Sequence, residues 1–159
     1  MIQIYRRRLY SFLIRLCGDR DIADDLFQET VIKIWNGLKH YREQQKFSSW
    51  IFTLAHNVTI DYRRKNKITE VDIEEVEIES SENVFENIEL KEAGKIVAGL
   101  LKNVPEKQKR VFLLRQHSDM SFKEIAELTN EPLNTVISQM NYAVKKIRKQ
   151  LKGSYGPGK

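Results

Sequence analysis

The residues of this chain that could do chemistry lie in two stretches, and both suit contact with nucleic acid. The first stretch contains Trp50, Asn57, Asp61 and the basic run Arg63–Lys65. Bases offer flat faces to aromatic rings and polar edges to amides, while phosphates attract cations. The simpler interpretation is a core tryptophan on a helix whose basic end complements the helix dipole. Composition alone leaves both interpretations open.

The second stretch has the pattern of a helix-turn-helix. Ser121 and Glu124 have the spacing of a capping box, and the small residue Ala126, a break at Asn130 and a longer helix from Pro132 follow. An ordinary helical hairpin is the alternative. In a helix-turn-helix the second helix enters the major groove with its N-terminal residues towards the bases. We expect Asn134, Thr135, Ser138 and Gln139 to face bases, and Tyr142, Lys145, Lys146, Arg148 and Lys149 to lie towards phosphates.

Neither stretch contains a catalytic or metal-binding set. The three histidines, His40, His56 and His117, have no cysteine or carboxylate partner at the spacing of a metal site. The dense acidic cluster of the chain lies in a segment without regular periodicity, which cannot fix the carboxylates that a metal-dependent nuclease needs. We therefore expect no metal, no cofactor and no enzymatic activity.

The charge pattern divides the chain into three parts. Residues 1–67 carry a net charge of +6, residues 68–92 carry −9, and residues 93–159 carry +8. An acidic tether between two basic modules would repel the nucleic acid that both modules bind. Two helical domains with a merely solvated linker are the alternative. We expect domains at 1–67 and 83–152, a flexible acidic linker at 68–82, and a loose tail at 153–159.

Apolar residues recur at helical spacing, which predicts an all-α fold of two small helical domains. In the first domain we expect helices from about Ile2 to Gly18, from an N-cap at Asp21 to Leu38, and from a cap at Ser48 or Ser49 to Lys65. In the second domain we expect helices over about 84–101, from Pro105 to about 117, over 122–128, and from Pro132 to about 151.

The helix expected over 21–38 has two different sides. The inward side comprises Ala23, Leu26, Thr30, Ile34 and Leu38, and the outward side includes Asp25, Gln28, Glu29 and Ile32. Ile32 is an apolar residue among charges. One exposed isoleucine is ordinary, but beside Gln28, Glu29 and Trp35 it could also anchor a protein contact.

The single cysteine, Cys17, excludes an intrachain disulfide and fits a reducing compartment. It lies in an apolar helical pattern, so we expect a buried structural thiol. No apolar run approaches the roughly 18 residues that a membrane-spanning helix needs. We therefore expect a cytoplasmic protein without membrane insertion.

Three stretches resemble the extracytoplasmic-function (ECF) sigma factors of bacterial RNA polymerase. Residues 21–35, DIADDLFQETVIKIW, resemble the family's segment that docks on the polymerase clamp helices. Residues 47–57, FSSWIFTLAHN, with DYRR at 61–64, resemble the segment that opens and reads the −10 element. Residues 104–115, VPEKQKRVFLLR, with SFKEIAE at 121–127 and Thr135-Val136, resemble the domain that reads the −35 element. The three stretches occur in the family's order.

The resemblance implies a sigma factor that binds core polymerase through its clamp helices and flap, melts promoter DNA and initiates transcription, held by an anti-sigma factor. The implied polymerase contacts are Asp25, Gln28, Glu29, Ile32 and Trp35. The implied −10 contacts are Tyr41, Arg42, Gln45, Asn57, Asp61, Arg63, Arg64 and Lys65. The implied −35 contacts are Asn134, Thr135, Ser138, Gln139, Tyr142, Lys145 and Lys146.

This chain departs from the family's pattern in the expected recognition helix. Ile137, Gln139 and Tyr142 stand where similar proteins commonly have basic residues, and Asn130 replaces the usual turn glycine. The −35 sequence of the family therefore cannot be transferred. The alternative function is a stand-alone helix-turn-helix transcriptional regulator, which would leave the outward set of residues 25–32 unexplained.

Overall fold

The computed structural model describes residues 2–42, 46–66 and 99–155. Its helices are α1 (Ile2–Cys17), α2 (Arg20–Gly37), the 3-10 helix η1 (Leu38–His40), α3 (Phe47–Lys65), α5 (Glu106–His117), α6 (Phe122–Thr129) and α7 (Leu133–Tyr155). The described residues contain no strand, which confirms the all-α prediction. The expected linker at 68–82 and all but the last residues of the helix expected over 84–101 lie outside the described residues.

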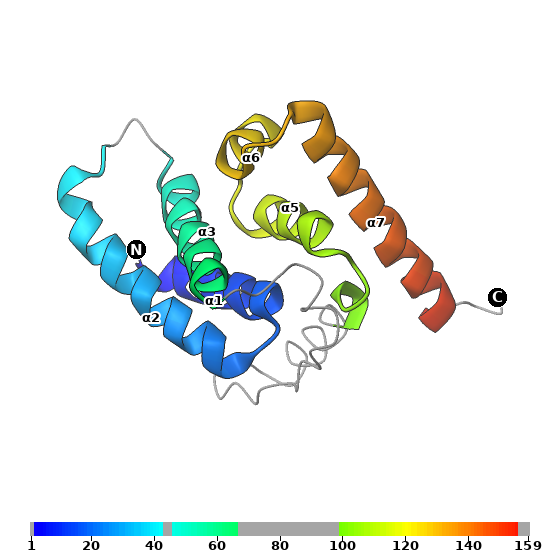
Figure 1. The fold of residues 1–159 in the computed structure, drawn as a ribbon, viewed down its shortest axis with the longest axis horizontal. Helices are drawn as coiled ribbons and strands as arrows, with labels where there is room; N and C mark the ends of the chain where they lie inside the picture. Colours follow the sequence, from blue (N-terminus) through cyan, green and yellow to red (C-terminus); the bar gives the residue numbers. More distant parts are fainter. Residues whose placement is uncertain (1, 43–45, 67–98, 156–159) are drawn as a thin grey trace.

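The first domain is formed by α1, α2 and α3, which pack against one another around a core of large apolar side chains (Figure 1). The rings of Phe12 from α1 and Phe52 from α3 meet edge to face, with their centroids 5.4 Å apart. Gly18 ends α1 with a φ of 74°, a left-handed conformation that glycine adopts without a steric penalty. The inward side expected for α2 is buried at Ala23, Leu26, Thr30 and Ile34.

Three local predictions in this domain are wrong. The N-cap of α2 is Asp19 and not Asp21. The Asp19 carboxylate accepts a hydrogen bond of 3.1 Å from the Ile22 N–H. Its backbone is extended, as a cap requires, whereas Asp21 already lies within the helix. Helix α3 begins at Phe47 without a side-chain cap, so neither Ser48 nor Ser49 fills that position. Leu38 leaves α2 for the 3-10 turn and is partly exposed.

The second domain is formed by α5, α6 and α7, with α5 and α6 packed against α7. The predicted capping box is present: the Glu124 N–H donates to Ser121 Oγ and the Ser121 N–H donates to the Glu124 carboxylate, both at 3.1 Å. Asn130, where the sequence predicts a break, adopts the left-handed conformation, with φ 57° and ψ 43°. Val136 and Ala143 of α7 are fully buried against this domain.

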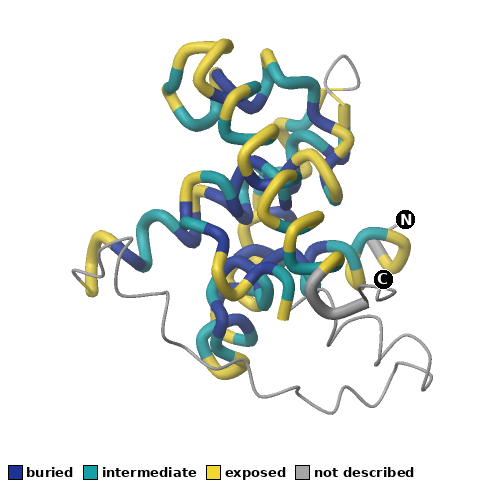
Figure 2. Tube along the Cα trace, turned by 90° about the vertical axis from the view of Figure 1, so that its right-hand side faces the viewer, coloured by how far each residue is buried: buried dark blue, intermediate teal, exposed yellow. Residues whose placement is uncertain are grey.

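The two domains pack against each other, chiefly through α1 and α5. Figure 2 shows buried residues continuing through both groups of helices. Ser48 at the start of α3 donates a buried hydrogen bond of 2.6 Å to the Ser118 carbonyl at the end of α5, which explains why it does not cap its own helix. None of the helices described is long and apolar enough to cross a membrane.

Candidate nucleic-acid interface

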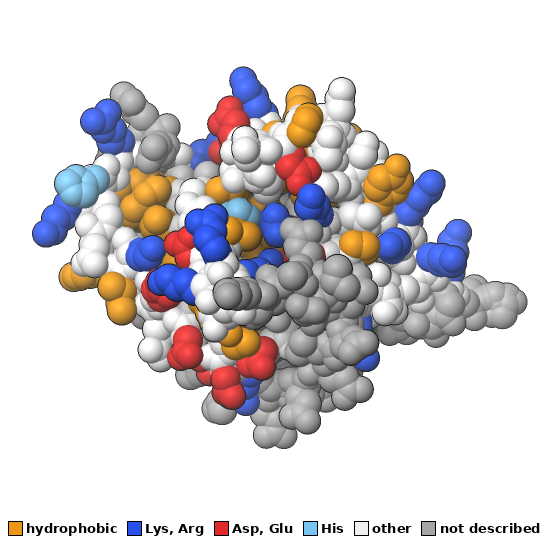
Figure 3. Space-filling model, viewed as in Figure 1, with side chains coloured by type: hydrophobic (Ala, Val, Ile, Leu, Met, Phe, Trp, Pro, Cys, Tyr) orange, Lys and Arg blue, Asp and Glu red, His pale blue; other side chains and the backbone are white. Residues whose placement is uncertain are grey.

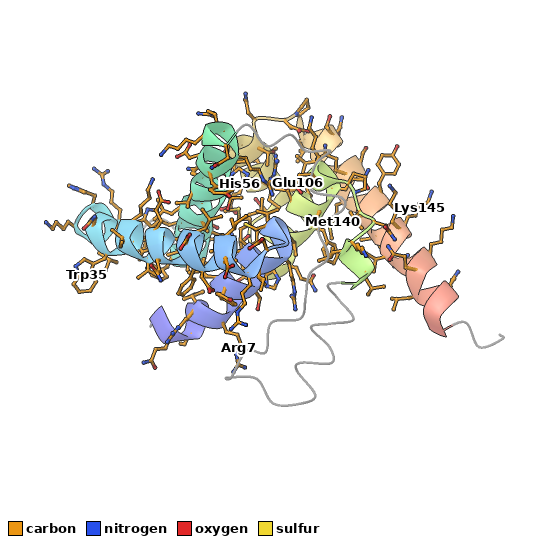
Figure 4. All side chains as sticks on the ribbon, turned by 60° about the horizontal axis from the view of Figure 1, so that its bottom comes forward. Arg7, Trp35, His56, Glu106, Met140 and Lys145 are labelled. Carbon is orange, nitrogen blue, oxygen red and sulfur yellow. The ribbon has the colours of Figure 1, made fainter. Side chains whose placement is uncertain are left out.

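Helix α7 carries the side chains predicted to face DNA on its outward surface. Asn134, Thr135, Ser138, Tyr142, Lys145 and Lys146 are all exposed, and Gln139 is half-buried. Asn134, Ser138 and Lys145 lie on the opposite side of the helix from Val136 and Ala143, which face the core, and the other four residues lie on one adjoining flank. Figure 3 shows basic side chains along the outer edge of this helix, and Figure 4 shows Lys145 projecting away from it. The structure thus brings the predicted −35 set onto one accessible face.

Glu131, in the turn before α7, belongs to this surface although sequence reasoning missed it. Its carboxylate accepts a hydrogen bond of 3.0 Å from Gln139 Nε2 and lies 3.8 Å from Lys107 Nζ of α5. The Glu131 N–H donates to the Ala126 carbonyl at 3.1 Å, which fixes the turn. The eight-residue separation of Glu131 and Gln139 spans a turn, so helical periodicity gives no signal for the pair.

Helix α3 carries the second predicted set, and its members point in two directions. Asn57, Arg64 and Lys65 are exposed and Asp61 is half-buried, with a carboxylate oxygen 4.0 Å from Arg64 Nη1. Arg63 points inward instead, with a side chain only 9% exposed. The amide of Asn57 and the cations of Arg64 and Lys65 are therefore accessible to bases and phosphates, whereas Arg63 is not accessible in this arrangement.

The loop before α3 is anchored by aromatic packing. The rings of Tyr41 and Trp50 lie 5.0 Å apart between centroids, and Phe47 lies within 5.8 Å of both. A Cβ atom added to Gly37 would lie 2.8 Å from Trp50, so the glycine permits this close approach. Trp50 is therefore a packing residue, as the simpler interpretation proposed. Arg42 is exposed beside this cluster, and Gln45 lies outside the described residues.

The outward side of α2 presents all the residues predicted to contact a protein. Asp25, Gln28 and Glu29 are exposed, Ile32 is 59% exposed and Trp35 is 69% exposed. Trp35 projects from the end of the helix in Figure 4. Ile32 and Trp35 are one helical turn apart, so two large apolar side chains share one solvent-facing patch. An exposed apolar patch rimmed by polar residues is typical of a protein-binding site.

A buried ion cluster joins the two candidate DNA-binding domains. Glu106 at the start of α5 pairs with Arg63 of α3 and lies 3.5 Å from Lys109 Nζ, and its side chain is only 1% exposed. Arg63 Nη2 also donates to the Leu16 carbonyl at 3.0 Å. At the edge of the same contact Lys46 pairs with Glu124 at 3.2 Å. The sequence contains no signal for these pairs.

Two histidines at the contact between the domains are kept neutral. Burial, with the positive charges of Arg110 and Arg63, lowers the pKa of His56 to about 4. Burial, with the charges of Arg15 and Arg8, lowers the pKa of His117 to about 4. Figure 4 labels His56, which lies on α3 of the first domain, and Glu106, which lies on α5 of the second. Burial raises the pKa of Cys17 to about 12, which keeps its thiol protonated.

The described ranges contain no group of three histidine, cysteine, aspartate or glutamate residues that could hold a metal ion. What they do contain is a helix-turn-helix with an exposed polar recognition helix, a second helical domain with exposed amide and basic side chains, and an apolar patch on α2. These features define a two-domain helical protein with a candidate DNA-binding face and a separate exposed apolar patch on α2.

Comparison with known proteins identifies the family. The model of Sigma-70 region 2 matches residues 1–68, and the model of Sigma-70, region 4 matches residues 95–147. The ECF RNA polymerase sigma factors SigW and SigM of Bacillus subtilis (strain 168) are each 29% identical over 166 residues. The SigW match covers 96% of this chain and 87% of SigW, and the SigM match covers 98% and 93%. The chain belongs to the ECF sigma factors.

A solved structure has the same fold. The sigma factor RpoE of Bartonella quintana, crystallised in complex with the anti-sigma factor NepR, matches with a TM-score of 0.70 and 23% sequence identity. The match covers 95% of this chain and 94% of that chain. The helix-turn-helix lies within the residues that match Sigma-70, region 4, and the family models and relatives support transcription initiation over the alternative of a stand-alone regulator.

Proposed function

We propose that this sigma factor binds core RNA polymerase through the α2 patch and reads promoter DNA through α3 and α7. The patch formed by Ile32 and Trp35 carries the proposal, because two large apolar side chains at 59% and 69% exposure need a partner. Asp25, Gln28 and Glu29 form its polar rim. The clamp helices of the polymerase are the partner that family membership indicates for this segment.

The DNA contacts are divided between the two domains in this proposal. Asn57, with Arg64 and Lys65, contacts the melted −10 strand, and the exposed face of α7 contacts the −35 duplex. We assign residues 1–67 to the first task and residues 83–152 to the second, with 68–82 as the tether. Promoter opening needs no bond chemistry from this chain, so we expect it to have no catalytic activity of its own.

An anti-sigma factor is the second partner that we propose, since the similar RpoE of Bartonella quintana was solved with one. A protein that covers the α2 patch or holds the two domains together would prevent assembly with the polymerase. Because the chain acts with RNA polymerase, we place it in the cytoplasm.

Run-off transcription with purified bacterial core polymerase and a promoter library tests the proposal. We expect initiation that depends on this protein, with a loss of at least about tenfold in the Gln28→Ala/Ile32→Ala double variant, since removal of an interface hot spot costs about 2 kcal/mol or more. Ile4→Ala is the matched control, because Ile4 is also a highly exposed isoleucine, on α1. No initiation, together with tight binding of the protein alone to duplex DNA, would refute the assignment.

A further inference from the structure

The Gln139 side chain is held in one orientation by a residue outside its own helix. Its Nε2 atom donates to Glu131 Oε2 at 3.0 Å. A carboxylate accepts hydrogen bonds but donates none, so the nitrogen of the Gln139 amide, and not the oxygen, must face Glu131. The hydrogen bond to the Glu131 carboxylate therefore determines the orientation of the Gln139 amide.

The position of Glu131 is also fixed. Asn130 is left-handed, and the N–H groups of Asn130 and Glu131 both donate to the Ala126 carbonyl, which locks the turn between α6 and α7. Lys107 Nζ of α5 lies 3.8 Å from the other carboxylate oxygen. This cation offsets the negative charge of Glu131, which would otherwise repel DNA phosphates near the recognition helix.

The groups of Gln139 that remain available match one base. A primary amide has two N–H bonds, and Glu131 uses one of them. A base contact through both groups requires Glu131 to accept from the N–H that lies anti to the amide oxygen, which leaves the oxygen and the syn N–H as a neighbouring acceptor and donor. In the major groove adenine presents the complementary pair, the N6 amino group and the N7 acceptor, and glutamine is a preferred reader of that pair. Thr135 and Tyr142, at one helical turn on either side of Gln139, are exposed, so the amide lies at the accessible surface of α7.

We propose that Gln139 reads an adenine in the −35 duplex and that Glu131 is the positioning residue that sets this preference. This inference rests on the proposed function, since it assumes that α7 enters the major groove of the promoter. It adds a base specificity to a position at which this chain departs from the basic residues common in its family.

The test is run-off transcription from a library in which the −35 region is randomised and the −10 region is held constant. Full-length protein and core polymerase are used throughout, and the transcribed templates are sequenced. With the wild-type protein we expect one −35 position with an adenine preference of roughly 5- to 150-fold, the discrimination of one bidentate contact. Gln139→Ala should abolish the preference at that position alone, and Gln139→Arg should shift it to guanine, the base that arginine reads.

Glu131→Ala tests the positioning role. The variant leaves Gln139 in place but frees its amide to turn over, so the adenine preference should fall by at least about threefold while other positions keep theirs. Gln116→Ala and Glu127→Ala are matched controls on exposed positions of α5 and α6, and should leave the whole profile unchanged.

The outcomes separate this inference from the proposed function. Absence of any transcript that depends on the protein overturns the proposed function and the inference together. Transcripts whose base preferences are the same for wild type, Gln139→Ala and Gln139→Arg overturn the inference alone and leave the sigma factor assignment standing. A Gln139→Ala variant that lowers the melting temperature without altering any base preference would show that the Glu131–Gln139 bond only braces the turn.

Discussion

The buried carboxylate of Glu106 provides the sharpest test of how the two domains are held together. It lies between Arg63 of the first domain and Lys109 of its own helix, and the three side chains are 1%, 9% and 9% exposed. The Glu106→Ala substitution would leave two cations buried without a counter-charge. Breaking a buried ion pair in this way costs about 3–5 kcal/mol.

A loss of that size is a large part of the stability of a small protein, which is commonly about 5–15 kcal/mol. Equilibrium unfolding in urea, followed by circular dichroism, measures it directly. With a urea dependence of about 1–3 kcal/mol per molar, the midpoint should fall by more than about 1 M. Glu127→Ala removes an exposed carboxylate on α6 and should change the unfolding free energy by less than about 0.5 kcal/mol.

A double-mutant cycle then attributes the loss to the contact between domains. Arg63→Met and Glu106→Gln are combined, and the coupling free energy is the difference between the double variant and the sum of the single variants. We expect a coupling of more than about 1 kcal/mol, since the two side chains touch in a buried site. Strictly additive effects, or a loss of less than about 1 kcal/mol in Glu106→Ala, would refute the docked arrangement of the two domains in solution.

Two further predictions concern the same fold. The unfolding free energy should fall by roughly 1.4 kcal/mol per pH unit for each of His56 and His117 as the pH decreases from 6.5 towards 5. Their pKa values of about 4 in the folded state lie below the unfolded value of 6.5, so only the unfolded state gains protons in this pH range. Urea unfolding at several pH values measures the effect. An unfolding free energy that does not change with pH would show that the histidines are exposed. Gly37→Ala should destabilise the protein by about 1–2 kcal/mol, because its Cβ would lie 2.8 Å from Trp50 and overpacking outweighs the gain in helix propensity. Thermal unfolding compares it with Gly99→Ala, whose added Cβ meets no atom within 4 Å and should cause no loss of stability.

The helices were predictable because their signals are local. The apolar periodicity located the ends of α1 within one residue and those of α3 within three, and the pattern from Ser121 to Pro132 located the turn of the helix-turn-helix. The N-cap of α2 was not predictable in the same way. Asp19 and Asp21 are chemically equivalent candidates, and only the extended backbone of Asp19, with φ −141° and ψ 127°, decides between them.

The contacts between distant parts of the chain were not predictable from one sequence. Arg63 and Glu106 are separated by 43 positions, and nothing in their spacing indicates that they meet. The pairing of Glu131 with Gln139 depends on a turn whose path is known only once Asn130 is seen to be left-handed. Exposure was easier to predict: the outward assignment of Ile32 on α2 follows from helical geometry alone, and the structure places it as expected.

The location of Arg63 has a consequence for DNA binding. In this structure its guanidinium group is used by Glu106 and the Leu16 carbonyl, so it has no surface left for a phosphate. Arg64 and Lys65, the next two residues of α3, are exposed and need no rearrangement to contact DNA. The predicted contact of Arg63 with the −10 strand therefore requires α5 to separate from α3, which would bring Glu106 and Lys109 to the surface together. Removal of the Glu106 carboxylate thus has two effects. It lowers the stability of the docked form, and it frees Arg63, the predicted −10 contact that is buried in the docked form.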